Sequence, residues 1–157
     1  INLKEKERDI VRTWRNNDNV KKWMYSNKYI LKSEHNMFIK KLKNDPFNFY
    51  WLVKRKDNTY LGVIYINRLN CRYRNAYLGV YSSPNTKGSG KILIRCLKRI
   101  AFKLIKLRSL RLEVIENNAK AINFYKKAGF KIEGRLKEFI FRNNSWQDVI
   151  LMGMKRT

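Results

Sequence analysis

The sequence predicts a mixed α/β domain, of the α+β class, with a strand–helix–strand crossover at its centre. Three observations lead to this prediction: helical stretches precede three strand-like runs, helical spacing takes over at Gly90, and two strands close the chain. With 157 residues, 44% of them hydrophobic, the chain is long enough to bury one core. We therefore expect a single domain over residues 1–157.

Helices dominate the first third of the chain. Apolar residues recur at helical spacing within residues 4–16, after a short strand expected at residues 1–3. A second helix is predicted over residues 33–45, with Ser33 as its N-cap. One face of this second helix is expected to bury three side chains: Met37, Phe38 and Leu42.

The middle of the chain reads as strands. Runs rich in aromatic and β-branched residues occupy residues 49–55, 59–68 and 76–82. Asp57-Asn58 and a polar connector near residues 70–75 separate these runs. The short connections predict an antiparallel meander.

Helical spacing returns at Gly90, where an amphipathic helix is expected to begin. Its apolar stripe comprises Leu93, Leu97, Ile100, Ala101 and Leu104. A strand over residues 109–115 and a short helix closed by Gly129 come next. The last two strands are predicted at residues 131–141 and 148–154.

Charge is the strongest compositional signal. Lys and Arg number 36 against 12 Asp and Glu, which gives a formal net charge of +24. Basic surfaces bind nucleic acid by displacing counterions from phosphates. The cations are scattered along the chain, however, and a lysine-rich solvated surface or a small polyanionic ligand, such as a coenzyme or a nucleotide-sugar, also explains the charge, so charge alone does not separate the three explanations.

A structural metal and a membrane span are not expected. His35 is the single histidine, and Cys71 and Cys96 are isolated, so zinc-ligand spacing is missing. No apolar run approaches the roughly 18–20 residues that cross a bilayer. We expect a reduced, cytoplasmic protein without metal.

The segment "PNTKGSGKILI" at residues 84–94 places a glycine-rich loop between a strand and a helix. Unpaired amides and the helix dipole favour phosphate at such a site. Neither common phosphate motif fits, because Ile92 follows Gly90-Lys91 where a Walker loop needs Ser or Thr, and Leu93 replaces the third glycine of GxGxxG. Read from its residues alone, the loop is either a tight turn or an anion site.

Two motifs in the second half resemble those of the GNAT N-acetyltransferases. "NTKGSGKIL" at residues 85–93 is similar to the acyl-coenzyme A loop [RQ]xxGx[GA], with Asn85 in place of Arg or Gln. Residues 116–138 are similar to the closing motif NxxAxxxYxxxGFxxEG, which Asn118, Ala121, Tyr125, Gly129, Phe130, Glu133 and Gly134 meet. The resemblance implies a GNAT fold, with a mostly antiparallel mixed sheet flanked by helices, and acetyl-CoA as the donor.

The first half resembles one branch of this superfamily more closely. "WRNNDNVKKWMYSNKYILKSEHNMF" and "LGVYSSPNTKGSG" are similar to bacterial enzymes that acetylate the 4-amino group of a UDP-linked sugar on the way to pseudaminic acid. In those relatives the loop also reads PN-x-KG-x-G, so Asn85 is expected there. Acetyltransferases of ribosomal-protein N-termini and of polyamines share the "WRN" start and the "EGRLKE" ending.

The resemblance also implies the coenzyme-binding residues. The pyrophosphate would bind the backbone amides of Lys87, Gly88, Ser89, Gly90 and Lys91. The pantetheine arm would pair with the strand that contains Leu78, Gly79 and Val80, in the manner of an added strand. Asn118 would hydrogen-bond this arm or cap its helix. Tyr125 would protonate the departing thiolate, because a phenol carries its proton at neutral pH; a core aromatic is the alternative.

The acceptor residues are less sharply indicated. Five side chains are expected to line a nucleotide-sugar cleft: Arg15, His35, Asn67, Arg68 and Tyr81. Arg15 offers a fork that suits diphosphate. Glu113 is either a cleft base or a surface or lysine-paired carboxylate, and a water chain is the other route for the amine proton. The amine would attack the thioester directly in a ternary complex.

Three functions therefore stand at this stage. A UDP-amino-sugar acetyltransferase comes first; an enzyme of the same fold acting on a ribosomal-protein N-terminus or a polyamine is the second. The 12 acidic residues, spread along the chain, count against a polyamine site. A non-catalytic nucleic-acid-binding module is the third, and no helix-turn-helix, zinc-finger or RNP-like motif supports it. We expect no membrane partner, and the sequence leaves a homodimer open.

Overall fold

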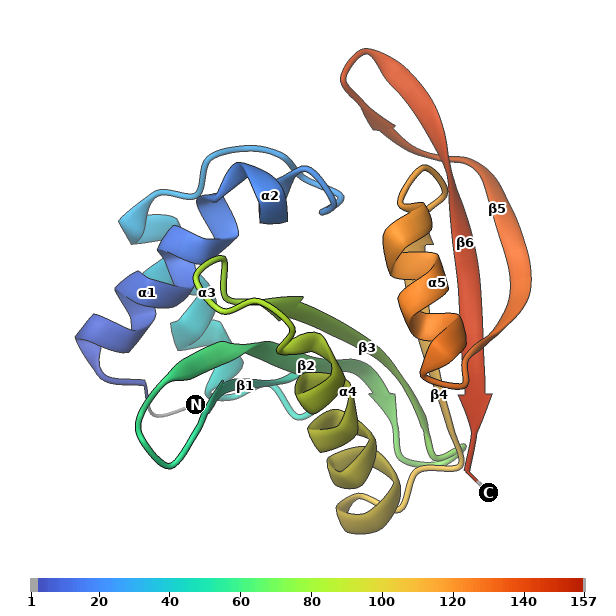
Figure 1. The fold of residues 1–157 in the computed structure, drawn as a ribbon, viewed down its shortest axis with the longest axis horizontal. Helices are drawn as coiled ribbons and strands as arrows, with labels where there is room; N and C mark the ends of the chain where they lie inside the picture. The colour runs from blue at the N-terminus through green and yellow to red at the C-terminus, as the bar shows by residue number, and fades with distance from the viewer. Residues whose placement is uncertain (1–2, 157) are drawn as a thin grey trace.

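A mixed six-stranded sheet organises the chain (Figure 1). The computed structural model describes residues 3–156. The strand order is β1-β2-β3-β4-β6-β5, and only β3 and β4 run parallel. The strands are β1 Phe49–Lys54, β2 Tyr60–Asn70, β3 Asn75–Ser82, β4 Ser109–Ile115, β5 Lys131–Arg142 and β6 Ser145–Lys155. The predicted meander and the predicted fold class are confirmed.

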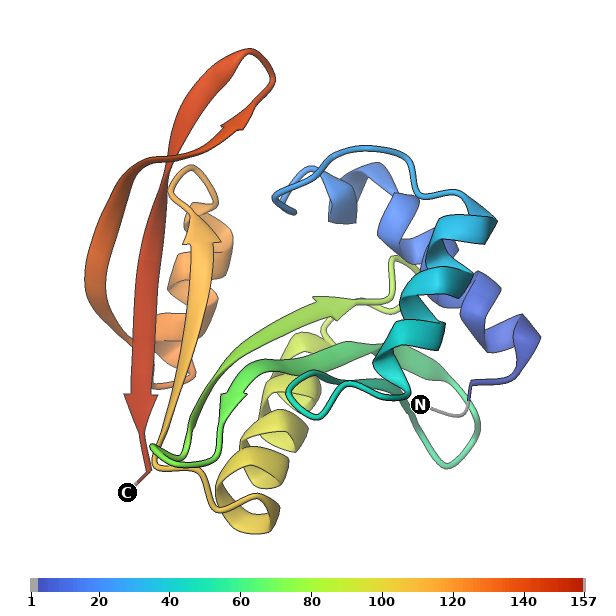
Figure 2. The ribbon, with the colours of Figure 1, turned by 180° about the vertical axis from the view of Figure 1, so that it is seen from behind.

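Helices cover both faces of this sheet (Figures 1 and 2). They are α1 Glu5–Asn16, α2 Asp18–Lys21, α3 Lys32–Leu42, α4 Gly90–Arg99 and α5 Ala119–Lys127, with a π-helical turn η1 Ile100–Leu104 continuing α4. In Figure 1, α4 and α5 lie in front of the strands, while α3 lies behind them. Helix α4 forms the predicted crossover between the parallel strands β3 and β4.

The two parallel strands separate soon after they begin. Residues 75–77 of β3 pair with residues 109–111 of β4, and the rest of each strand has no partner in the other. Beyond this point β3 stays paired with β2, and β4 stays paired with β6. The sheet therefore opens into two halves, visible as a V in both views.

The core lies where α4 packs against the sheet. Leu93, Leu97 and Ala101 are fully buried, as the helical spacing predicts. Leu104 is 69% exposed, so its expected place in the stripe is wrong. The backbone N–H of Ile105 donates to the carbonyl of Ile100, and this wider i→i+5 turn rotates Leu104 away from the sheet.

The second long helix begins earlier than predicted, and it buries a different face. Leu31 is the N-cap of α3 and Ser33 lies inside the first turn, because the Glu34 carboxylate accepts a hydrogen bond from the Leu31 N–H at 2.8 Å. The buried residues are His35, Ile39 and Leu42, whereas Met37 and Phe38 are exposed. Met37 lies two residues from Ile39, which at 3.6 residues per turn points it away from the sheet.

Three further boundaries differ from the expectations. Residues 1 and 2 of the expected first strand lie outside the described residues, and Leu3 is not in a strand. The short helix α2 was not predicted; the Asn17 side chain caps it by accepting from the Asn19 N–H at 3.0 Å. The last strand begins at Ser145 instead of residue 148, because the hairpin with β5 continues through a turn at Asn143 and Asn144, both with positive φ.

No helix within residues 3–156 is long and apolar enough to span a bilayer.

Leu97→Ala should lower the free energy of unfolding by about 2–5 kcal/mol, because it opens a cavity at a side chain with no exposed surface. Chemical denaturation monitored by circular dichroism measures the change. Leu104→Ala, in the turn that follows the same helix, is the matched control and should shift stability by no more than about 0.5 kcal/mol. Equal losses from the two variants would contradict the packing described for α4.

Candidate functional site

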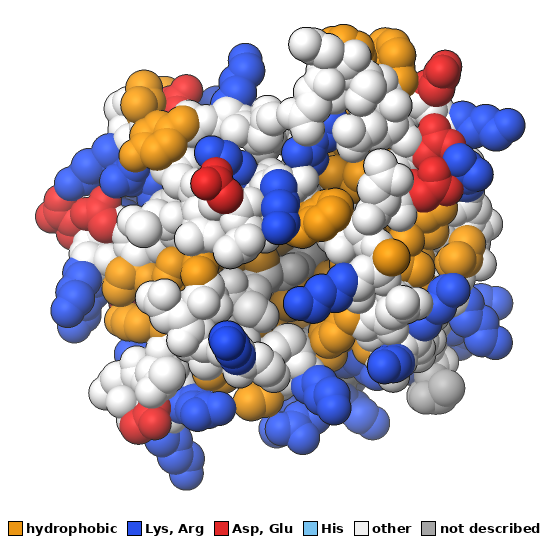
Figure 3. Space-filling model, turned by 45° about the horizontal axis from the view of Figure 1, so that its top comes forward, with side chains coloured by type: hydrophobic (Ala, Val, Ile, Leu, Met, Phe, Trp, Pro, Cys, Tyr) orange, Lys and Arg blue, Asp and Glu red, His pale blue; other side chains and the backbone are white. Residues whose placement is uncertain are grey.

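A cleft lies between the diverging strands β3 and β4. We call it the strand cleft; Leu78, Gly79 and Val80 line its β3 side, and Val114 and Ile115 line its β4 side. Figure 3 looks toward this side of the molecule, where a hollow lies between the two halves. Since β3 has no β4 partner here, its backbone edge is open to an extended ligand.

The glycine loop leads from the strand cleft into α4. Five successive backbone N–H groups donate to no acceptor within residues 3–156. They belong to Lys87, Gly88, Ser89, Gly90 and Lys91. Gly88 has φ +76°, a conformation that L side chains rarely adopt. These amides stand at the N-terminus of a ten-residue helix, so the loop can hold an anion.

The same loop is fixed to the sheet by its side chains. The buried Ser89 hydroxyl donates to the Leu61 carbonyl at 3.0 Å, and the Thr86 hydroxyl donates to the Tyr60 carbonyl at 3.1 Å. Both carbonyls belong to the first residues of β2. The amides of the loop are thus held in place by the protein itself.

Helix α5 brings Asn118 and Tyr125 to the opposite wall of the strand cleft. Asn118 caps the helix, since its side-chain oxygen accepts from the Ala121 N–H at 3.1 Å. Tyr125 packs between Phe124 and Phe130 and lines the cleft. Burial raises the pKa of the Tyr125 phenol, which keeps its proton at neutral pH.

Tyr65 lines the strand cleft and also the two further cavities described below, and the sequence patterns did not single it out. It pairs with Gly79 across β2 and β3, and a Cβ at Gly79 would collide with its ring. Only glycine therefore lets this ring lie over β3. Burial raises the pKa of Tyr65, so its hydroxyl also stays protonated.

A second cavity adjoins the strand cleft on the side of β2. We call it the arginine cavity; its lining includes Arg15, Asn67 and Arg68. The Nη1 of Arg15 and the Oδ1 of Asn67 are buried and have no hydrogen-bond partner in residues 3–156. Buried polar atoms without partners are rare in folded proteins, so these two mark a place for a polar ligand.

Glu113 joins the two halves of the molecule at the edge of this cavity. Its carboxylate accepts from the Arg68 guanidinium at 2.8 Å and from the Tyr25 hydroxyl at 2.7 Å. Arg68 also lies over the Tyr77 ring at 4.6 Å. The carboxylate thus lines the strand cleft and is paired with an arginine instead of the lysine that the sequence suggested.

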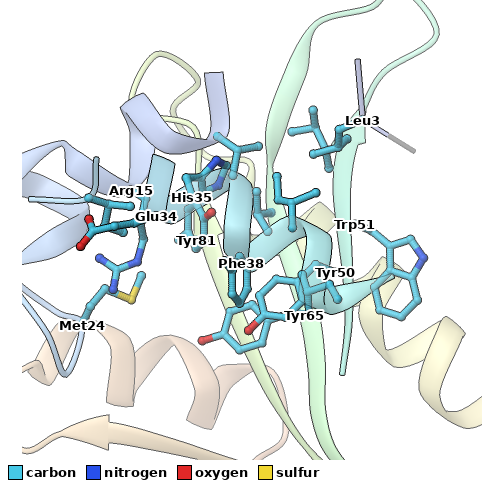
Figure 4. Close-up of a pocket in the computed structure, with 16 residues that line it drawn as sticks. Leu3, Arg15, Met24, Glu34, His35, Phe38, Tyr50, Trp51, Tyr65 and Tyr81 are labelled. Atoms are coloured by element: carbon cyan, nitrogen blue, oxygen red, sulfur yellow. The ribbon is translucent and has the colours of Figure 1, made fainter. Parts of the chain in front are cut away.

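A third cavity of about 370 Å³ lies beneath α3 (Figure 4). We call it the histidine cavity; it is lined by His35, Tyr81 and Arg15 among mostly apolar side chains. Burial lowers the pKa of His35, so the ring is neutral at pH 7. Burial also raises the pKa of the Tyr81 phenol. The five predicted acceptor residues therefore divide between two cavities that share Arg15, and one of the five, Tyr81, also lines the strand cleft.

Comparison with known proteins identifies the family. The acetyltransferase (GNAT) domain family matches residues 3–151. The chain belongs to the GNAT acetyltransferases. This GNAT enzyme is an acetyl-CoA-dependent N-acetyltransferase, as its sequence motifs predicted.

Two of the individual relatives bear on the acceptor. Acetyltransferase PseH of Campylobacter jejuni (strain 81-176) is 34% identical over 137 residues, 87% of this chain and 85% of the relative. Spermidine N(1)-acetyltransferase of Vibrio cholerae is 25% identical over 142 residues, 89% of this chain and 82% of the relative. A crystal structure of the Vibrio enzyme with CoA and spermine superposes with a TM-score of 0.90 at 24% identity, covering 98% and 92% of the two chains, which shows the shared fold.

Sequence reasoning missed the segment between α1 and α3. Trp23 and Met24 line both the strand cleft and the arginine cavity, and Tyr25 reaches Glu113 from the same segment. Its aromatic "WMY" run was the available signal. No group of three or more potential metal-ligating side chains occurs in the described part of the chain.

Tyr125→Phe should lower kcat at least ten-fold and leave the Kd for acetyl-CoA within two-fold, because the ring still packs while the proton donor is lost. Thiol release gives kcat, and calorimetry gives the Kd. Tyr29→Phe, at a tyrosine that is 61% exposed, is the control and should behave as the parent. Near-parental turnover of Tyr125→Phe would show that the Tyr125 hydroxyl is not the proton donor.

Proposed function

We propose that the enzyme transfers acetyl from acetyl-CoA to the 4-amino group of a UDP-linked amino-deoxy sugar. The observation that carries the proposal is the charge of the acceptor side. Arg15 reaches into both acceptor cavities and has no carboxylate within 4.0 Å in residues 3–156. A guanidinium with a buried, unpartnered nitrogen suits a diphosphate, which accepts from it bidentately.

The two carboxylates that line these cavities are already engaged. Glu34 accepts from the Leu31 N–H, and Glu113 accepts from both Arg68 and Tyr25. A polyamine needs several unpaired carboxylates to replace its water. Of the two carboxylates that line the cavities in the described residues, Glu113 is paired with Arg68, which leaves Glu34 as a single carboxylate without an ion-pair partner. Charge therefore favours an anionic acceptor over spermidine, although spermidine acetyltransferases share the fold.

Two bridges across the top of the cleft favour a small acceptor over a protein terminus. Arg142 of β5 donates to the Met24 carbonyl at 2.7 Å, and Asn27 donates to Asn143 at 2.8 Å. These bonds tie the α2–α3 segment to the β5–β6 hairpin. The 34% identity to acetyltransferase PseH over 137 residues supports the same branch of the family that the first-half motifs resemble.

The proposed reaction is a direct transfer in a ternary complex. The neutral amine attacks the thioester carbonyl, the C–N bond forms, and the C–S bond breaks. Tyr125 supplies the proton that the departing thiolate takes up. Both oxygens of Glu113 accept hydrogen bonds, so the amine proton leaves through water. The pyrophosphate of the donor would lie on the amides of residues 87–91, and its pantetheine arm along β3.

A panel assay tests the acceptor. Thiol release from acetyl-CoA should occur with UDP-4-amino-4,6-dideoxy sugars and remain at background with spermidine and with ribosomal-protein N-terminal peptides. Faster release with spermidine or a peptide would refute the sugar proposal and leave the acetyltransferase in place. RNA binding with steep salt dependence and no thiol release would favour a non-catalytic nucleic-acid-binding module.

Arg15→Ala and His35→Ala should each raise KM for the UDP-sugar at least ten-fold and change KM for acetyl-CoA less than two-fold. The reason is that both side chains line acceptor cavities and neither lines the strand cleft. Steady-state kinetics with each substrate varied gives both constants. Arg55→Ala, in the exposed β1–β2 turn, is the control. Equal effects on the two KM values would indicate a loss of folding instead.

Arg68→Gln should raise the ratio of spermidine to UDP-sugar turnover, measured as kcat/KM, by on the order of ten-fold. The change leaves Glu113 charged and without its guanidinium partner, and such a carboxylate attracts cations. The double variant Arg68→Gln/Glu113→Gln should return the ratio to the parental value. If the double variant keeps the altered ratio, the ion pair has no part in selectivity.

A further inference from the structure

The basic side chains are distributed unevenly over the fold. Residues 58–112 contain 12 Lys and Arg and no Asp or Glu, so all 12 acidic residues lie outside this stretch. The stretch runs from β2 through β3 and α4 into β4. This region of the molecule therefore carries positive charge and has no acidic residue of its own to neutralise it.

Three segments bring these cations to one end. The Arg108 N–H donates to the Arg74 carbonyl at 2.6 Å, and the Arg156 N–H donates to the Arg108 carbonyl at 2.9 Å. We call this end the basic pole; its exposed cations are Arg72, Arg74, Lys103, Lys106, Arg108, Lys155 and Arg156. None of the seven forms an ion pair with a described residue.

The basic pole is remote from the coenzyme loop. It lies at the bottom of Figures 1 and 2, beside the β2–β3 turn and the C-terminal end, while the bridged segments of the cleft lie at the top. Fifteen helical residues, from Gly90 to Leu104, separate it from the loop, a length of roughly 20 Å at 1.5 Å per residue. Pyrophosphate at residues 87–91 cannot account for cations so far away.

Two apolar side chains stand among these cations. Leu104 is 69% exposed and Tyr73 is 63% exposed, and they are the two most exposed large hydrophobic residues in the described chain. Leu104 faces outward because of the π-helical turn, and Arg72 lies over the Tyr73 ring at 5.4 Å. Phosphates of RNA would match the cations and a base could stack on Tyr73, but base faces stack on flat rings and offer no comparable partner to the branched side chain of Leu104. Cations around an exposed leucine and an aromatic ring match the anionic, half-apolar surface of a bilayer.

We propose that the basic pole binds the surface of an anionic phospholipid bilayer. The cations contact the headgroup phosphates, and Leu104 and Tyr73 enter the boundary between headgroups and acyl chains. The cleft then faces away from the lipid and stays open to dissolved substrates. The proposal goes beyond the acetyl transfer and is independent of which acceptor is used.

Sedimentation with vesicles tests the proposal. The parent should partition onto vesicles that contain phosphatidylglycerol and should stay in solution with phosphatidylcholine alone. Lys103→Glu/Lys106→Glu should weaken the partition by at least about ten-fold. Lys40→Glu/Lys41→Glu, on exposed positions of α3, makes the same charge change elsewhere and should weaken it less than three-fold. Thiol release in solution should be unchanged in both variants.

Leu104→Gln separates a bilayer from a nucleic acid. It keeps every charge, so it should weaken vesicle partition by at least about three-fold and leave any binding to a single-stranded RNA oligonucleotide unchanged. The proposal is overturned by no partition of the parent onto phosphatidylglycerol vesicles, by equal losses in the two charge variants, or by parental partition of Leu104→Gln.

Discussion

The early end of the pairing between β3 and β4 is the constraint on which the rest of the structure depends. Three residues of each strand are paired, and beyond them each strand keeps one partner only. An unpaired strand edge inside a protein needs another hydrogen-bonding partner. The coenzyme arm of an acetyltransferase can be that partner. The cleft is therefore a gap between two neighbouring strands in the middle of an open six-stranded sheet.

The fold could be predicted from the sequence to the extent that each element carries its own pattern. Strands with alternating or aromatic-rich runs and the helix that starts at Gly90 appeared where their patterns placed them. Phe38 and Leu104 were misplaced for a different reason. Their burial depends on where a helix begins and on one π-helical turn, and hydrophobic spacing contains neither piece of information.

The candidate site likewise has a part that local sequence patterns predict and a part that they do not. The proposed coenzyme side rests on backbone amides and on a motif, so local sequence indicated it. The proposed acceptor side is assembled from side chains far apart in sequence: Tyr25 and Glu113, which are hydrogen-bonded, are 88 residues apart. Tyr65 became visible only through its cross-strand neighbour Gly79. Long-range pairing of this kind has no local signature, and the split of the five acceptor residues between two cavities could not be foreseen.

The wall between the strand cleft and the arginine cavity has a thermodynamic consequence. Trp23, Met24, Tyr65, Leu78 and Glu113 line both spaces. In the proposed arrangement, a donor that immobilises these side chains on one face would already order them for the acceptor on the other, so the second ligand would lose less conformational entropy. By linkage, the acceptor would strengthen donor binding by the same factor. The shared wall would thus make the binding of the two substrates cooperative.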